Sequence, residues 1–127
     1  TFMSNPVCWF EIYVNDMARA KLFYQTVIGS ELSLLSDPND SSVEMWTFPS
    51  DMSQYGATGS LVKMEGISAG GNSTIVYFSS KDCAIEEARV AAAGGQVHQT
   101  KMSIGPHGHI VLAIDTEGNM FGIHSMN

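Results

Sequence analysis

The sequence has few cysteines and few basic residues. Its only cysteines, Cys8 and Cys83, each lie in a segment with the pattern of regular structure. Two cysteines are too few for the disulfide framework of a small secreted scaffold, so we expect reduced thiols in a core. Thirteen acidic residues against six scattered basic ones give a formal net charge of −7. This balance argues against nucleic-acid phosphates or anionic membranes as partners.

Long apolar runs and familiar catalytic motifs are also missing. No stretch approaches the about 20 apolar residues of a membrane-spanning helix, and no signal-peptide pattern is present, so we expect a soluble, cytoplasmic protein. There is no Gly-x-Ser-x-Gly elbow and no phosphate-binding glycine loop, which leaves nucleophilic catalysis without a motif. The 127 residues, 44% of them hydrophobic, fit a single domain over residues 1–127.

What the sequence does contain is an internal repeat. Tyr13 precedes Gly29 by 16 residues, and Tyr77 precedes Gly94 by 17. In each half, a β-like run with the tyrosine leads into an amphipathic helix that ends at the glycine. A chain built from two like modules tends to hold small molecules in the cleft between them.

The periodicity predicts one strand, one helix and three strands in each half. The first module, residues 7–66, has expected strands at residues 7–14, 32–35, 43–48 and 60–64. The second, residues 73–126, has expected strands at residues 74–78, 96–101, 109–114 and 120–126. Asn15 or Asp16 caps the first helix and Asp82 the second. A glycine-rich linker, residues 65–72, joins the modules.

Four short sequences resemble those of a known family. Residues 14–24, VNDMARAKLFY, are similar to the strand-to-helix entry of the vicinal oxygen chelate superfamily, which includes glyoxalase I, bleomycin-resistance proteins and extradiol dioxygenases. Residues 115–119, DTEGN, resemble its hairpin turn, and FEI at 10–12 with FGIH at 121–124 resembles its glyoxalase-related branch. The resemblance implies an α+β fold whose tandem βαβββ modules form a shared curved mixed sheet around a central cavity. It also implies a homodimer.

Metal-bearing members of that superfamily take two ligands from each module. The resemblance assigns these positions to Trp9, Ser60, Ser73 and Gly122, none of which is a competent ligand for a divalent cation. Shifting the register by one residue does not restore four converging donors. We therefore expect no metal cofactor.

The histidines offer only a weak alternative metal site. All four, His98, His107, His109 and His124, lie in the second half. If the last hairpin pairs residues whose numbers sum to 233, His109 faces His124, whereas a sum of 234 places them on opposite faces. The sequence leaves both registers open.

Glu11 is the most interesting polar residue. It alternates with Trp9 and Tyr13 on the strand face that lines the cavity in the family, where desolvation would suit it to general acid or base catalysis. A carboxylate hydrogen-bonded to a neighbouring strand is the structural alternative.

Aromatic residues indicate a binding wall for a planar or apolar molecule, although aromatic residues in strands are commonly ordinary core. The expected ligand-binding residues are Trp9, Glu11, Tyr13, Trp46, Ser73, Ile75, Tyr77, His109 and His124. Residues 49–58 and 102–108 are candidate flaps over the opening.

Three functions remain open at this stage. The first is metal-free binding of a small, partly apolar organic molecule between the modules. The second is a lyase or isomerase, either metal-free with Glu11 and a tyrosine as acid–base pair or with an unorthodox histidine metal site. The third is a filled cavity in a protein that acts through a protein interface.

Overall fold

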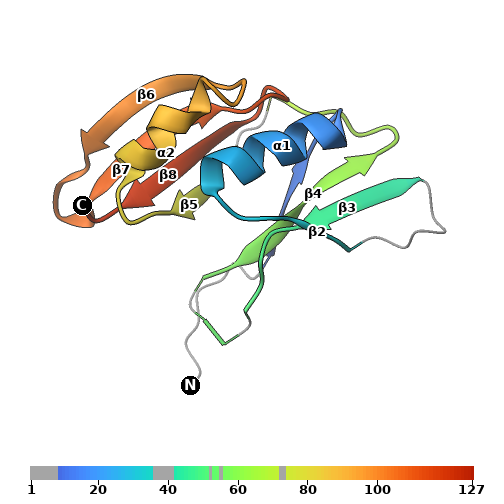
Figure 1. Cartoon of the computed structure of the whole chain (residues 1–127), viewed down its shortest axis with the longest axis horizontal. Coiled ribbons are helices and arrows are strands. Elements are labelled where there is room, and N and C mark those ends of the chain that lie inside the picture. The colour runs from blue at the N-terminus through green and yellow to red at the C-terminus, as the bar shows by residue number, and fades with distance from the viewer. Residues whose placement is uncertain (1–8, 36–41, 52, 55, 72–73) are drawn as a thin grey trace.

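The computed structural model describes residues 9–35, 42–51, 53–54, 56–71 and 74–127. Two modules follow one another, each with the order strand, helix and three strands (Figure 1). The first consists of β1 (Trp9–Tyr13), α1 (Met17–Ile28), β2 (Ser33–Leu34), β3 (Val43–Thr47) and β4 (Thr58–Met64). The second consists of β5 (Tyr77–Ser79), α2 (Cys83–Val90), β6 (Gln96–Ser103), β7 (His109–Ile114) and β8 (Met120–Ser125), with a 3₁₀ turn, η1 (Gly105–His107), before β7. The predicted α+β fold with tandem βαβββ modules is confirmed.

Each module forms its own four-stranded mixed sheet. The strand orders are β1-β4-β3-β2 and β5-β8-β7-β6, and in each sheet the first strand runs parallel to the last. β1 and β5 are therefore edge strands at corresponding positions. The two helices lie on the same side of the molecule and pack against each other (Figure 1).

Local capping chemistry defines both helices. The side chain of Asp16, rather than Asn15, accepts the backbone N–H of Arg19 at 3.1 Å and caps α1, and Gly29 ends it with φ 81°. Asp82 caps α2 by accepting the N–H of Ala84 at 3.0 Å. α2 ends at Val90, earlier than expected, because the chain continues through turns to Gly94 and Gly95.

An aromatic core joins the modules. Phe10, Tyr24 and Phe48 of the first module meet Phe78 and Phe121 of the second. The ring centroids of Phe48 and Phe78 lie 5.3 Å apart, those of Tyr24 and Phe121 5.4 Å, and those of Phe10 and Phe78 5.9 Å. Such pairs add about 0.5–1.5 kcal/mol each beyond their area burial. The modules thus share one core.

The hairpin at residues 115–119 of the second module fastens onto the first; we call it the clasp. Glu117, whose side chain has no exposed surface, accepts the backbone N–H groups of Asn15 and Asp16 at 2.9 Å each. It also accepts Nε and Nη2 of Arg19 at 2.6 and 3.0 Å, and the hydroxyl of Thr116 at 3.0 Å. The β1–α1 junction is therefore held by a buried carboxylate of the other module.

The sequence predicted a hairpin turn at residues 115–119, and the turn forms between β7 and β8 with Gly118 at φ 83°. Tyr24 adds a second link by donating its hydroxyl to Asp115 Oδ2 at 2.6 Å. These links span 91 to 102 residues of sequence, so they depend on the complete fold.

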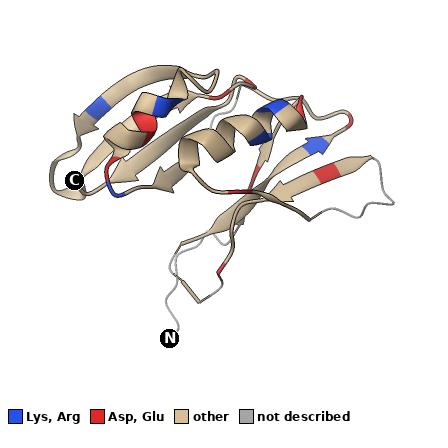
Figure 2. Ribbon diagram, viewed as in Figure 1, with Lys and Arg blue, Asp and Glu red and all other residues tan. Residues whose placement is uncertain are grey.

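Basic residues lie on several elements of both modules rather than on one (Figure 2). Neither described helix has the length and apolar character needed to cross a bilayer.

Candidate functional site

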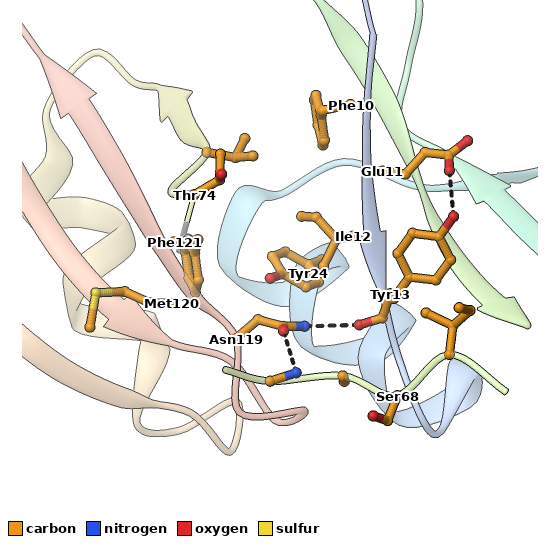
Figure 3. Close-up of a pocket in the computed structure, with 14 residues that line it drawn as sticks. Phe10, Glu11, Ile12, Tyr13, Tyr24, Ser68, Thr74, Asn119, Met120 and Phe121 are labelled. Carbon is orange, nitrogen blue, oxygen red and sulfur yellow. Dashed lines mark hydrogen bonds between the residues drawn. The ribbon is translucent and has the colours of Figure 1, made fainter. Parts of the chain in front are cut away.

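A cavity of about 400 Å³ lies between the two modules, alongside edge strand β1 (Figure 3). Its walls come from β1, α1, the inter-module segment of residues 67–70, the segment leading into β5, and the start of β8. The lining residues are Phe10, Glu11, Ile12, Tyr13, Tyr24, Ile67, Ser68, Ala69, Gly70, Thr74, Val76, Asn119, Met120 and Phe121. Cavities that hold small ligands usually measure about 300–1,000 Å³, so this one is at the small end.

The floor of the cavity is apolar. Tyr24 and Phe121 are buried, and Phe10 and Ile12 point to the same side of β1 (Figure 3). Burial and the neighbouring Asp115 carboxylate raise the pKa of Tyr24 well above its usual value, so its phenol stays protonated. A molecule in the cavity would rest on aromatic rings.

Glu11 and Tyr13 occupy the other side of β1, at the exposed rim (Figure 3). Tyr13 donates its hydroxyl to Glu11 Oε1 at 2.9 Å, and the indole N–H of Trp9 donates to Oε2 at 3.3 Å. The hydrogen bond to Glu11, followed by burial, raises the pKa of the Tyr13 phenol. The rim therefore combines a carboxylate with a phenol that is hydrogen-bonded to it.

Asn119 closes one end of the cavity. Its Nδ2 donates to the backbone oxygen of Tyr13 at 3.0 Å, and its Oδ1 accepts the N–H of Gly70 at 2.7 Å (Figure 3). The N–H of Ala69 donates to Asn15 Oδ1 at 3.1 Å. These hydrogen bonds hold residues 69–70 of the linker in place, where they form part of the cavity wall.

Most of the predicted ligand-binding residues share the sheet faces that turn away from the helices. Pairing of β1 with β4 keeps Trp9, Glu11 and Tyr13 on one face, opposite buried Ile12. In the second sheet, Tyr77 alternates with Phe78, which packs in the core, and His124 alternates with buried Ile123. Ile75 lies in the segment that leads into β5. Of this set, the cavity lining includes Glu11 and Tyr13.

Two predicted residues lie on the helix side instead. Trp46 is paired with Leu61, and Lys21 Nζ of α1 lies 3.2 Å from the centre of its indole. His109 is paired with Ser125, whose hydroxyl accepts the backbone N–H of Cys83 at the start of α2. Neither side chain joins the rim.

The structure decides between the two registers left open for the last hairpin. His109 pairs with Ser125 and Ile110 with His124, so partner numbers sum to 234. The two imidazoles lie on opposite faces and do not form a pair. The ring Nε2 of His124 instead hydrogen-bonds the backbone oxygen of His107 at 2.7 Å.

Of the four positions that the resemblance assigns to the family metal, the three that lie in the described residues do not supply a suitable donor set. Trp9 offers only an indole N–H, and Ser60 offers one hydroxyl, which is buried without a hydrogen-bond partner. Gly122 has no side chain to act as a ligand, and an added Cβ would overlap the ring of Tyr77. Ser73 lies outside the described residues. Nor does the described part of the chain contain three or more His, Cys, Asp or Glu side chains grouped to hold an ion.

Sequence reasoning missed much of the cavity lining. Tyr24 had the pattern of a helix core position, Asn119 that of a turn, and residues 67–70 that of a linker. Their meeting depends on tertiary contacts for which the sequence carries no local signal.

Comparisons with known proteins identify the family. A sequence profile described as the Glyoxalase/Bleomycin resistance protein/Dioxygenase superfamily matches residues 7–123. No curated protein matches the sequence significantly.

Solved structures share the fold. Glyoxalase I from Zea mays aligns with a TM-score of 0.72 and 18% identity over 95% of this chain, which spans about half (46%) of the maize chain. An antibiotic-binding protein from Streptomyces sp. CB03234 aligns over 98% of both chains, with a TM-score of 0.66 and 24% identity. A glyoxalase-related enzyme from Fulvimarina pelagi aligns with a TM-score of 0.66 and 16% identity over 96% of this chain and 88% of its own. At these identities the structures show the fold alone, whereas the profile covers most of the sequence. The chain belongs to the Glyoxalase/Bleomycin resistance protein/Dioxygenase superfamily.

Proposed function

We propose that this protein binds a small, partly apolar organic molecule in the cavity between its modules, without the divalent metal of its family. The observation that carries the proposal is the cavity of about 400 Å³ with an aromatic floor and a polar rim. The unsuitable donors at Trp9, Ser60 and Gly122 support binding that does not depend on a metal. The full-length match to an antibiotic-binding protein supports sequestration as the purpose.

A thermal-shift screen against a broad metabolite and antibiotic panel, with and without a chelator, tests this function. A ligand at 100 times its dissociation constant stabilises the fold by about 2.7 kcal/mol, which such a screen detects easily. We expect hits that survive chelation. A panel without a single hit, or hits abolished by the chelator, would contradict the proposal.

A blocking variant locates the site. Ser68 is exposed and lines the cavity, so Ser68→Trp should fill the opening at little cost in stability and abolish the shifts. Ser33→Trp, at an exposed position of β2, is the matched control and should retain them. Equal shifts in both variants would place binding elsewhere.

The 2.9 Å hydrogen bond between Tyr13 and Glu11 favours a second candidate function. In a metal-free isomerase or lyase, Glu11 would act as the base and the Tyr13 phenol as the acid. Glu11→Gln should then abolish turnover of a bound compound while preserving its binding. In a pure binder, the substitution changes affinity alone.

The proposal includes a cytoplasmic homodimer, as expected from the sequence. Cell fractionation tests the location, and analytical ultracentrifugation tests the assembly.

A further inference from the structure

The cavity lining that the structure describes carries no positive charge. Glu11 is the only carboxylic acid among the fourteen lining residues, and none of them is Lys, Arg or His. The nearby cations have other partners: Arg19 is paired with Glu117, and Lys21 lies over Trp46 on the helix side. An anionic ligand would therefore meet a carboxylate and nothing to neutralise it.

Two neutral hydrogen-bond donors orient the carboxylate of Glu11, and neither of them cancels its charge. Its donors are the indole of Trp9 and the phenol of Tyr13, both from its own strand. A carboxylate offers about four acceptor positions, so two neutral donors leave capacity for a ligand. Because these donors fix the orientation, a ligand does not have to order the side chain.

A comparison within the same sheet shows that this lack of a cation is specific to the sheet face that carries Glu11. Glu44 makes the same short-range contact, accepting Trp46 Nε1 at 2.9 Å. Across the β3–β4 ladder, however, Glu44 is paired with Lys63, whereas Glu11 is paired across β1–β4 with Ser60. Ser60 is buried, and its hydroxyl has no hydrogen-bond partner. Glu44 therefore has a basic residue opposite it in the sheet, whereas Glu11 has a neutral hydroxyl.

The size and walls of the cavity limit the rest of the ligand. A volume of about 400 Å³ suits a molecule of one or two fused rings. Phe10, Tyr13, Tyr24 and Phe121 provide aromatic contacts, which favour a planar ring and tolerate an adjacent cation.

We propose that the ligand is a small aromatic amine whose rings occupy the cavity and whose protonated nitrogen binds Glu11 at the rim. This inference rests on the proposed function and names the ligand class for that same cavity. It excludes anionic conjugates of similar size.

Three probes of matched size test the charge requirement: tryptamine, indole-3-ethanol and indole-3-acetate, which are cationic, neutral and anionic at pH 7. Isothermal titration calorimetry measures their affinities for wild type, Glu11→Gln and the control Glu44→Gln. We expect tryptamine to bind at least about tenfold tighter than indole-3-ethanol, the size of one charge-assisted hydrogen bond, and indole-3-acetate to bind weakest. Glu11→Gln should remove the preference for tryptamine and leave indole-3-ethanol unchanged, and Glu44→Gln should change neither.

Several results would overturn the inference. Equal affinities for the three probes, tightest binding of indole-3-acetate, or a preference for tryptamine that persists in Glu11→Gln would each do so. If no indole binds but other panel compounds produce thermal shifts blocked by Ser68→Trp, the ligand class is wrong and the proposed function stands. If no compound of either set binds, both fail.

Discussion

Replacing Glu117 by Gln tests the clasp most directly. Burial raises the pKa of Glu117, but hydrogen bonds from Arg19, the backbone of Asp16 and Asn15, and Thr116 outweigh it and lower the pKa from 4.5 to about 2. The substitution keeps the shape of the side chain and removes its charge. It also places an amide N–H₂ against an N–H of Arg19, which can only donate hydrogen bonds.

The shift in pKa sets the expected magnitude. A difference of about 2.5 units corresponds to about 3 kcal/mol of stability contributed by the ionised carboxylate. Arg19 is half exposed, with 51% of its side-chain surface accessible, so this value is an upper figure. The folded-state pKa of Glu117 lies below the unfolded value, so its contribution is complete above about pH 4.5. It is lost as the pH falls from there towards 2.

Urea denaturation of wild type and Glu117→Gln at pH 7, 5, 4 and 3 measures this contribution. We expect a stability difference of about 2–3 kcal/mol at pH 7 that shrinks steadily below pH 4.5. Glu31→Gln, at an exposed position, should change stability by less than about 0.5 kcal/mol at every pH. A difference for Glu117→Gln that is below about 1 kcal/mol at pH 7, or is independent of pH, would refute the argument.

Two further substitutions probe the core and the sheet, both by urea denaturation at pH 7. Tyr24→Phe should cost about 1–3 kcal/mol, because the buried carboxylate of Asp115 loses a 2.6 Å hydrogen bond; an unchanged midpoint would contradict this. Gly122→Ala should cost about 1–3 kcal/mol, because its methyl group would overlap the ring of Tyr77. In a Tyr77→Ala background the same change should cost much less, and an equal cost in both backgrounds would show that the ring is not the obstacle.

The parts of the fold that sequence predicted correctly depend on local chemistry. The Asp16 cap, the left-handed Gly29 and the 115–119 turn each involve contacts within a few residues, and their residue types are those that such conformations require. The order of the helices and strands could be predicted from the internal repeat, because the same order of patterns occurs in both halves of the sequence.

Strand faces were harder to predict, because they depend on register. Trp46 was expected on the ligand-binding wall, yet its pairing with Leu61 turns it towards α1. A shift of one residue would have exchanged the faces, as in the two registers left open for His109 and His124. Alternation along one strand shows which of its residues share a face. Only the pairing with neighbouring strands shows which residues of different strands lie on the same face of the sheet.

The proposed ligand binding should be linked to stability, because the cavity and the clasp share residues. Tyr24 and Asn119 both line the cavity and belong to the contacts that hold the clasp. Any ligand that contacts these two side chains binds the clasped arrangement of the modules and not a separated one, so it must also stabilise the clasp. By the same linkage, a cavity ligand should raise the urea midpoint of Glu117→Gln as it raises that of wild type, because Glu117 does not line the cavity. Glu11→Gln, at the exposed rim and outside the clasp, should affect the affinity for a cationic ligand and leave the free energy of unfolding nearly unchanged.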